Sequence, residues 1–151
     1  MDGDTAKQAY ALVHLTLGDW WKDDRRNWCA YCGIPMRRTA KKGSPVPSTK
    51  STRDHVIPRR HHGGLLTIPA CRACNSAKGA LSLPQFLLTD HFRERRKHRH
   101  RNQWTLDRLW LVAAAAALKR SAALSDAGRS KTADQGDSDR GRPRTSSRRR
   151  A

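Results

Sequence analysis

The N-terminal stretch of the chain carries apolar residues at helical spacing. Within residues 4–18, Tyr10, Val13 and Leu17 recur three and four positions apart, which places them on one face of an α-helix. Gly18 follows directly, and glycine is a common residue type where a helix ends. The pattern predicts an amphipathic helix over residues 4–18, packed onto the rest of the chain through the tryptophans that follow it.

Two helical patterns follow the centre of the chain. Residues 82–85, Ser-Leu-Pro-Gln, combine a capping serine, a first-turn proline and a glutamine that completes a capping box. A helix that buries Phe86 and Phe92 is predicted after them. Residues 104–123 are rich in alanine, the best helix former, and their apolar residues recur on one face. That face comprises Leu106, Leu109, Trp110, Ala113 and Ala117.

The C-terminal end differs in composition from the rest of the chain. Beyond about residue 125, alanine is the only apolar residue type, and Gly, Ser, Asp and Arg dominate. Such a segment cannot bury enough apolar surface to offset the entropy lost on ordering. Residues 124–151 are therefore expected to form a disordered basic tail.

Between the two helical regions lies a centre that contains all four cysteines and short apolar runs typical of β-strands. The 151 residues are 36% hydrophobic, enough for one modest core. We predict an α+β fold with a small central core over residues 28–80. Residues 1–27 form a helical, tryptophan-containing lead-in, and residues 81–123 form C-terminal helices.

Positive charge dominates the whole chain. Lys and Arg number 31 against 13 acidic residues, a formal net charge of +18. Such a surface attracts polyanions, of which nucleic acid is the commonest; the alternative for the tail is a basic segment that only aids solubility. Since the sequence lacks the roughly 18 consecutive apolar residues of a transmembrane helix, we expect a soluble, cytoplasmic protein without membrane contact, from a bacterial or phage-infected cell.

The four cysteines form two pairs with the same spacing. Cys29 and Cys32, and likewise Cys71 and Cys74, are separated by two residues, a spacing that directs both sulfurs of a pair at one tetrahedral ion. Gly33 relieves the first turn sterically. Two disulfides or two redox-active pairs are the alternatives. A reducing cytoplasm disfavours disulfides, and redox pairs normally belong to a thioredoxin-like scaffold that is not indicated here. The prediction is a structural Zn²⁺ site.

Between and just after the cysteine pairs lie residues suited to phosphodiester chemistry. Asp54 and Asn75 offer the hard oxygen ligands that Mg²⁺ or Mn²⁺ prefers. His55 can accept a proton from water near neutral pH, so that hydroxide attacks phosphorus and leaves 5′-phosphate and 3′-hydroxyl ends. Because side chains alternate along a strand, Asp54 and His55 converge on one site only if a twist or bulge intervenes.

Together, the motifs of residues 28–80 resemble those of the HNH endonuclease family, in the branch with a four-cysteine zinc site. The matching motifs are Cys29-x-x-Cys32, Asp54-His55-Val56-Ile57-Pro58, Gly63-Gly64 and Ile68-Pro69-Ala70-Cys71-x-x-Cys74-Asn75-x-x-Lys78-Gly79. The resemblance implies a zinc-stapled ββα-metal core, with His55 as general base, Asp54 and Asn75 as ligands of a catalytic metal, and the cysteines as zinc ligands. The asparagine that many members carry before the second pair has no counterpart here, where Thr67 is the nearest polar candidate.

The expected partner is DNA, duplex or branched. Basic residues of the loop over residues 33–53, of the segments beside the motifs and of the basic run near residue 95 are predicted to contact it. They are Arg37, Arg38, Lys41, Lys42, Arg53, Arg59, Arg60, Lys78, Arg95 and Arg96. A homodimer through the C-terminal helix is a further expectation. Two alternatives to a nuclease stay open, namely a zinc-dependent nucleic-acid-binding module without catalysis and an interaction protein that assembles through the alanine-rich helix.

Overall fold

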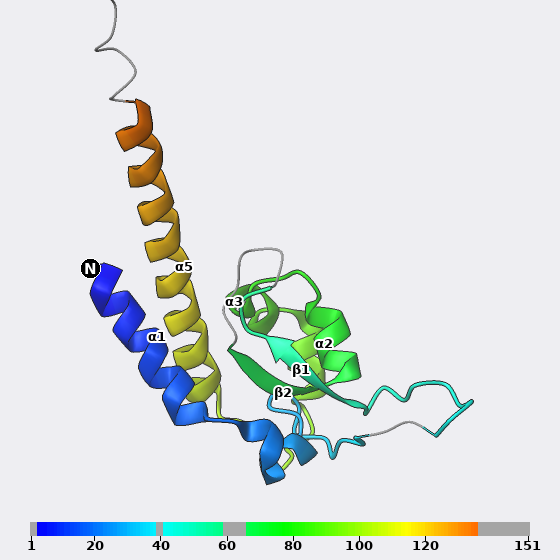
Figure 1. Cartoon of the computed structure of the whole chain (residues 1–151). Helices are drawn as coiled ribbons and strands as arrows, with labels where there is room; N and C mark the ends of the chain where they lie inside the picture. The colour runs from blue at the N-terminus through cyan, green and yellow to red at the C-terminus, as the bar shows by residue number, and fades with distance from the viewer. Residues whose placement is uncertain (1–2, 39–40, 59–65, 136–151) are drawn as a thin grey trace, which may run out of the picture.

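A short antiparallel hairpin covered by a helix forms the centre of the fold. The computed structural model describes residues 3–38, 41–58 and 66–135, with element labels as in Figure 1. Strand β1 (Ser51–His55) pairs with β2 (Thr67–Cys71) so that Ser51 faces Cys71 and Asp54 faces Ile68. Helix α2 (Arg72–Lys78) begins directly after β2, with Cys71 as its N-cap. This ββα arrangement confirms the predicted α+β fold.

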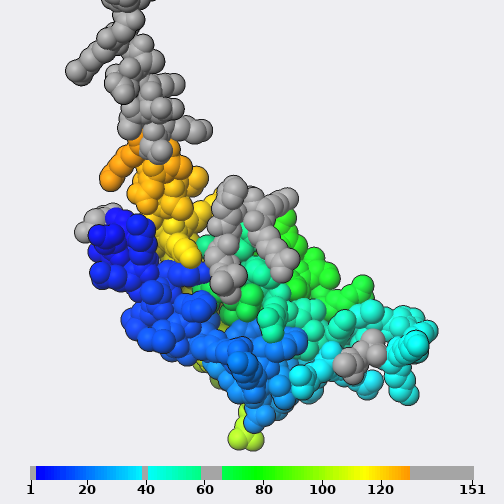
Figure 2. Space-filling model, viewed as in Figure 1, coloured from blue at the N-terminus to red at the C-terminus, as the bar shows by residue number. Residues whose placement is uncertain are grey.

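A two-helix arm stands beside the hairpin. Helix α1 (Gly3–Leu17) and helix α5 (Leu106–Gln135) pack along each other, as Figures 1 and 2 show in blue and in yellow to orange. Gly18 ends α1 with a φ of 57°, as its position in the sequence predicts. A surface ion pair of 3.6 Å between Lys7 and Asp126 joins the two helices far from the core.

Helix α5 departs from its prediction in length and in its buried face. It continues to Gln135, beyond residue 124, where the disordered tail is expected to begin. Residues 136–151 lie outside the described residues. Helix propagation is cooperative, and the strong alanine run extends into a polar segment of acceptable propensity. Leu109 and Ala113 are buried as predicted, whereas Leu106, Trp110 and Ala117 are exposed. The buried face also includes Val112, Ala115 and Ala116.

Because α1 and the core cover that face within one chain, the described residues give no support to a homodimer through it. Among the described residues, no helix combines the length and apolar character that crossing a membrane requires.

The chain between α2 and α5 forms two short helices rather than the one predicted. Helix α3 (Leu83–Leu87) has the predicted capping box between Ser82 and Gln85. Thr89 then interrupts the helix and caps α4 (Asp90–Arg95) through its side chain. Two 3₁₀ turns, η1 (Trp20–Lys22) and η2 (Asp24–Asn27), lead from α1 to the first cysteine pair.

One buried cluster connects the cysteine turn with β2 and with helices α1 to α5. Tyr31 lies at its centre, wholly buried, with its ring 4.8 Å from Phe86 and 6.2 Å from Phe92 between centroids. The edge-to-face geometry of these rings is the favourable one for aromatic pairs. The helices after α2 therefore pack directly against the cysteine turn, and the core includes the cysteines themselves.

Candidate metal centre and active site

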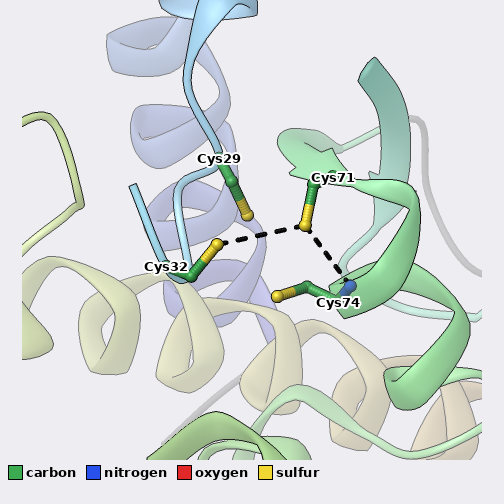
Figure 3. A group of neighbouring side chains, drawn as sticks. All are labelled: Cys29, Cys32, Cys71 and Cys74. Carbon is green, nitrogen blue, oxygen red and sulfur yellow. Dashed lines mark hydrogen bonds between the residues drawn. The ribbon is translucent and has the colours of Figure 1, made fainter. Parts of the chain in front are cut away.

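The four cysteines meet at one point between the first cysteine turn and the start of α2 (Figure 3). All four are buried and none is in a disulfide, and their ligand atoms lie within 4.8 Å of one another. The sulfurs of Cys32 and Cys71 are 3.9 Å apart. Tetrahedral zinc with Zn–S bonds of about 2.3 Å separates its sulfurs by about 3.8 Å. The cluster therefore fits a structural Zn²⁺ ion, as the spacing predicts.

Local backbone geometry builds the first cysteine turn. The Gly33 N–H donates to the Cys29 carbonyl (2.7 Å), and Gly33 adopts a φ of 73°. Any larger residue would be strained there, and its Cβ would lie 2.5 Å from the Cβ of His100. The Ala30 N–H donates to the Pro69 carbonyl (2.8 Å), which joins the turn to β2. These hydrogen bonds fix the positions of Cys29 and Cys32 relative to Cys71.

Hydrogen bonds among the sulfurs favour the thiolate form at Cys32 and Cys71, whereas burial raises the pKa of Cys29 and hydrogen bonds from the other cysteines raise the pKa of Cys74. The neighbouring Cys29 lowers the pKa of Cys32 to about 7, and hydrogen bonds from the other cysteines hold the pKa of Cys71 well below its usual range. Arg95 of α4 lies against the same sulfurs, with Nη2 at 3.6 Å from Cys71 and 3.9 Å from Cys32. Its charge partly balances the negative charge of a four-thiolate zinc site.

Replacing Arg95 with Gln is expected to weaken zinc binding by roughly tenfold or more, since the loss of outer-shell hydrogen bonds typically costs that much. Competition with a chromophoric chelator measures the change. Arg93→Gln is the matched control on α4, because Arg93 is exposed and pairs with Asp90 instead. Equal zinc affinities of the two variants would contradict the assigned role.

Asp54 occupies a buried polar cluster under α2. Only 3% of Asp54 and 1% of Lys78 are exposed, and Lys78 Nζ lies 3.0 Å from Asp54 Oδ1. The Tyr31 hydroxyl donates to Asp54 Oδ2. Lys78 also donates to the His55 carbonyl (3.0 Å). This Tyr31–Asp54–Lys78 cluster connects the cysteine turn, β1 and α2.

Opposing effects act on the carboxyl group of Asp54. Burial raises its pKa, and this is the largest effect; the charge of Lys78, hydrogen bonds from Tyr31 and Lys78, and the charge of His55 lower it, leaving the pKa raised overall. Burial, followed by the charge of Asp54, also raises the pKa of Tyr31 well above its usual value. Tyr31 is therefore a protonated donor to the carboxylate at neutral pH.

The predicted catalytic residues lie on two adjoining elements. Asn75 of α2 donates through Nδ2 to Thr52 Oγ1 (3.0 Å), two positions before Asp54 on the same face of β1. Asp54 and Asn75 therefore share the interface between β1 and α2. His55 is half-buried and, as the next residue of the strand, lies on the opposite face, where Thr67 is its partner in the register.

The oxygen donors of Asp54 and Asn75 are of the type that Mg²⁺ prefers. Asn75 keeps its amide oxygen for such a contact because its nitrogen bonds to Thr52. The Asp54 carboxylate, however, is buried between an ammonium and a hydroxyl group. The residues as arranged do not fit a divalent cation, because that ion would have to replace Lys78.

Comparison with known proteins supports the family that the motifs indicate. Residues 29–81 match the family model described as HNH endonuclease, and the four clustered cysteines lie within that match. This segment is an HNH domain. No curated protein and no solved structure is detectably similar to the chain.

Several basic residues predicted to bind nucleic acid make contacts within the protein instead. Lys78 is buried in its ion pair with Asp54, so its assignment to phosphate contact is wrong. Arg95 lies on the cysteine sulfurs, and Arg96 donates to the carbonyls of Tyr31 (2.5 Å) and Trp104 (2.9 Å). Both guanidinium groups are used within the protein and are not available as predicted.

The remaining predicted contacts are exposed or fall outside the described residues. Arg59 and Arg60, together with His61, His62 and Gly63-Gly64, lie in the undescribed segment 59–65. Arg53 is exposed on β1, with its guanidinium 4.5 Å from the ring centroid of Trp21. The loop between the first cysteine turn and β1, drawn in cyan, extends away from the body of the HNH domain (Figures 1 and 2). Its exposed cations are Arg37, Arg38, Lys41 and Lys42.

Tyr31 is a site residue that the sequence pattern did not reveal. It stands between two predicted zinc ligands, yet nothing local shows that its hydroxyl reaches Asp54. Lys78 had a usable signal: it follows Asn75 by three positions, and residues at that spacing share a helix face. A helix that turns Asn75 towards β1 therefore also turns Lys78 towards the strand that carries Asp54.

Proposed function

We propose that the chain is an endonuclease that hydrolyses phosphodiester bonds of DNA. The observation that carries the proposal is the HNH match over residues 29–81, within which Asp54 and His55 end one strand and Asn75 lies on the helix packed against it. The net charge of +18 favours a polyanionic substrate. The exposed basic loop before β1 supplies a surface for the phosphate backbone.

His55 is the proposed general base. It directly follows Asp54, and the backbone at this point is fixed because the His55 carbonyl accepts from buried Lys78 (3.0 Å). An imidazole with a pKa near neutrality can take a proton from the attacking water. Attack on phosphorus with loss of the 3′ oxygen leaves a 5′-phosphate and a 3′-hydroxyl group. End-labelling of the products tests that outcome.

Replacing His55 with Ala is expected to lower the rate of plasmid nicking by at least about a hundredfold, which is the usual contribution of a general base, while DNA binding stays intact. Conversion of supercoiled to relaxed plasmid measures nicking, and a gel shift measures binding. His98→Ala is the matched control, since His98 is exposed outside the HNH match. If His55→Ala nicks as fast as His98→Ala, another group is the base.

The proposal also includes a catalytic divalent cation. HNH-type hydrolysis would use Mg²⁺ or Mn²⁺ with oxygen ligands from Asp54 and Asn75, and the ion pair of Asp54 with Lys78 stands against this arrangement. Adding each cation in turn to the purified chain, with nicking as the readout, decides the point. A rate independent of added divalent cations would remove the catalytic metal from the proposal.

The buried ion pair specifically favours a second candidate function. A carboxylate paired with an internal ammonium group stabilises the fold and is not free to bind a catalytic ion. This is expected of a zinc-dependent nucleic-acid-binding module without catalysis. Such a module would bind DNA with strong salt dependence and nick no plasmid with any divalent cation. The plasmid experiment therefore separates the two functions with the same preparation.

A further inference from the structure

A basic pocket lies between η2 and the start of α5. Its volume is about 320 Å³, and Asp54, His55 and Asn75 are not among the described residues that line it. The lining combines three guanidinium groups with two indole rings. These belong to Arg25, Arg101, Arg108, Trp28 and Trp104. Asp24 also contributes to the lining, but the arginines outnumber it.

Arg108 is a half-buried cation of this pocket. Its guanidinium lies 3.9 Å from the ring centroid of Trp104, and within the described parts of the chain no carboxylate forms an ion pair with it. Burial, and then the charge of Arg25, lower its pKa. Arg25 is itself held by Asp23 through Nε (3.0 Å) and Nη2 (2.6 Å). A half-buried cation beside a second cation is costly until an anion neutralises it.

The walls of the pocket are fixed before any ligand arrives. The Trp104 N–H donates to the Ala30 carbonyl (2.9 Å), and Arg96 Nη2 donates to the Trp104 carbonyl (2.9 Å). Gly33 lets residues 100–103 approach closely, because a Cβ there would lie 2.8 Å from the Gln103 backbone nitrogen. The cysteine turn thereby positions both Trp104 and the first turn of α5. Preorganised walls reduce the entropy that binding costs.

We propose that this pocket binds a phosphate group of a nucleic-acid strand at a position separate from the candidate active site. Planar guanidinium groups match phosphate oxygens in pairs, and the half-buried indole of Trp28 suits an adjoining sugar or base. Trp104 is 6% exposed with Arg108 over its ring, so it supports the pocket as a wall. Arg108 and Arg101 hold the phosphate, with Trp28 and Trp104 as the walls. The proposal rests on the proposed function, since it assigns a second contact to the same strand that the HNH domain would cut.

Oligonucleotide binding by the full chain tests the pocket. His55→Ala serves as the non-cleaving background, and fluorescence anisotropy of labelled single-stranded and duplex oligonucleotides is the readout. Arg108→Gln is expected to weaken binding by about tenfold and to reduce the salt slope by about one. Arg101→Gln, at an exposed position that does not support the core, is expected to weaken binding by about threefold. Arg120→Gln is the matched control, because Arg120 is exposed on α5, the helix that also carries Arg108.

The outcomes separate the pocket from the nuclease. If Arg108→Gln and Arg101→Gln both bind like Arg120→Gln while the wild-type chain nicks plasmid, the pocket proposal is wrong and the nuclease stands. If the background variant binds no oligonucleotide, the pocket proposal fails, and the nuclease fails with it only if the wild-type chain nicks no plasmid. Inorganic phosphate and a mononucleotide are tested by calorimetry. Binding of either that Arg108→Gln abolishes, with oligonucleotide binding unchanged, would assign the pocket to a free phosphate compound and overturn the strand contact.

Discussion

Cys74→Ser is expected to unfold the HNH domain. Structural zinc supplies folding free energy on the order of 10 kcal/mol in small sites, and the four sulfurs lie inside the core rather than at its edge. Tyr31 is wholly buried between two of the ligands, with its ring against Phe86 and Phe92. Loss of the ion should therefore release the whole aromatic cluster, and near-ultraviolet circular dichroism should lose its Tyr and Trp bands.

Because of the arm of α1 and α5, unfolding of the core must be measured by a signal that comes from the core alone. Those helices contain much of the helical backbone, so far-ultraviolet circular dichroism alone can change little when the centre unfolds. Ser76→Ala is the matched control, because Ser76 is an exposed residue of the same helix as Cys74. A strong chelator added to the wild-type chain should reproduce the Cys74→Ser spectrum. A native near-ultraviolet spectrum in either case would mean that zinc does not stabilise the core.

The features that the sequence predicts well are those whose chemistry is local. Two residues between the cysteines of each pair let both sulfurs of a pair reach one ion, and the four sulfurs meet as expected. The capping box of Ser82 and Gln85 joins neighbours along the chain and needs no knowledge of the fold. The hairpin of β1 and β2 is expected from the resemblance of the motifs to the HNH family and not from the cysteine spacing.

The features that escaped prediction depend on contacts between distant segments. A lysine in the sequence is equally compatible with a phosphate contact and with an internal ion pair, and only the packing of α2 on β1 places Lys78 against Asp54. Arg95 appears in a basic run, and only the fold of α4 against the cysteine turn brings it to the sulfurs. Charge density alone therefore overstated the number of residues available to nucleic acid.

Lys78→Met is expected to destabilise the fold by about 3–5 kcal/mol, because removing one partner of a buried pair leaves the other charge uncompensated. Both side chains are almost wholly buried. Lys97→Met is the matched control, since the pair of Lys97 with Glu94 is exposed and such pairs contribute about 1 kcal/mol or less. Chemical unfolding at constant zinc concentration measures both variants.

The effect of Lys78→Met should depend on pH in a direction fixed by Asp54. The folded-state pKa of Asp54 is raised, first by burial. The stability that the protonated Asp54 carboxyl group contributes is therefore fully present below the unfolded pKa and is lost as pH rises through the folded pKa. Removing Lys78 removes the main effect that lowers this pKa, and the deficit of the variant should be smaller at about pH 5 than at about pH 8. Adding Asp54→Asn should recover part of the loss, because a neutral amide has no charge to bury. A deficit equal at both pH values and unchanged by Asp54→Asn would mean that Lys78 supports the fold by packing alone, which would leave the Asp54 carboxylate without its internal counter-ion.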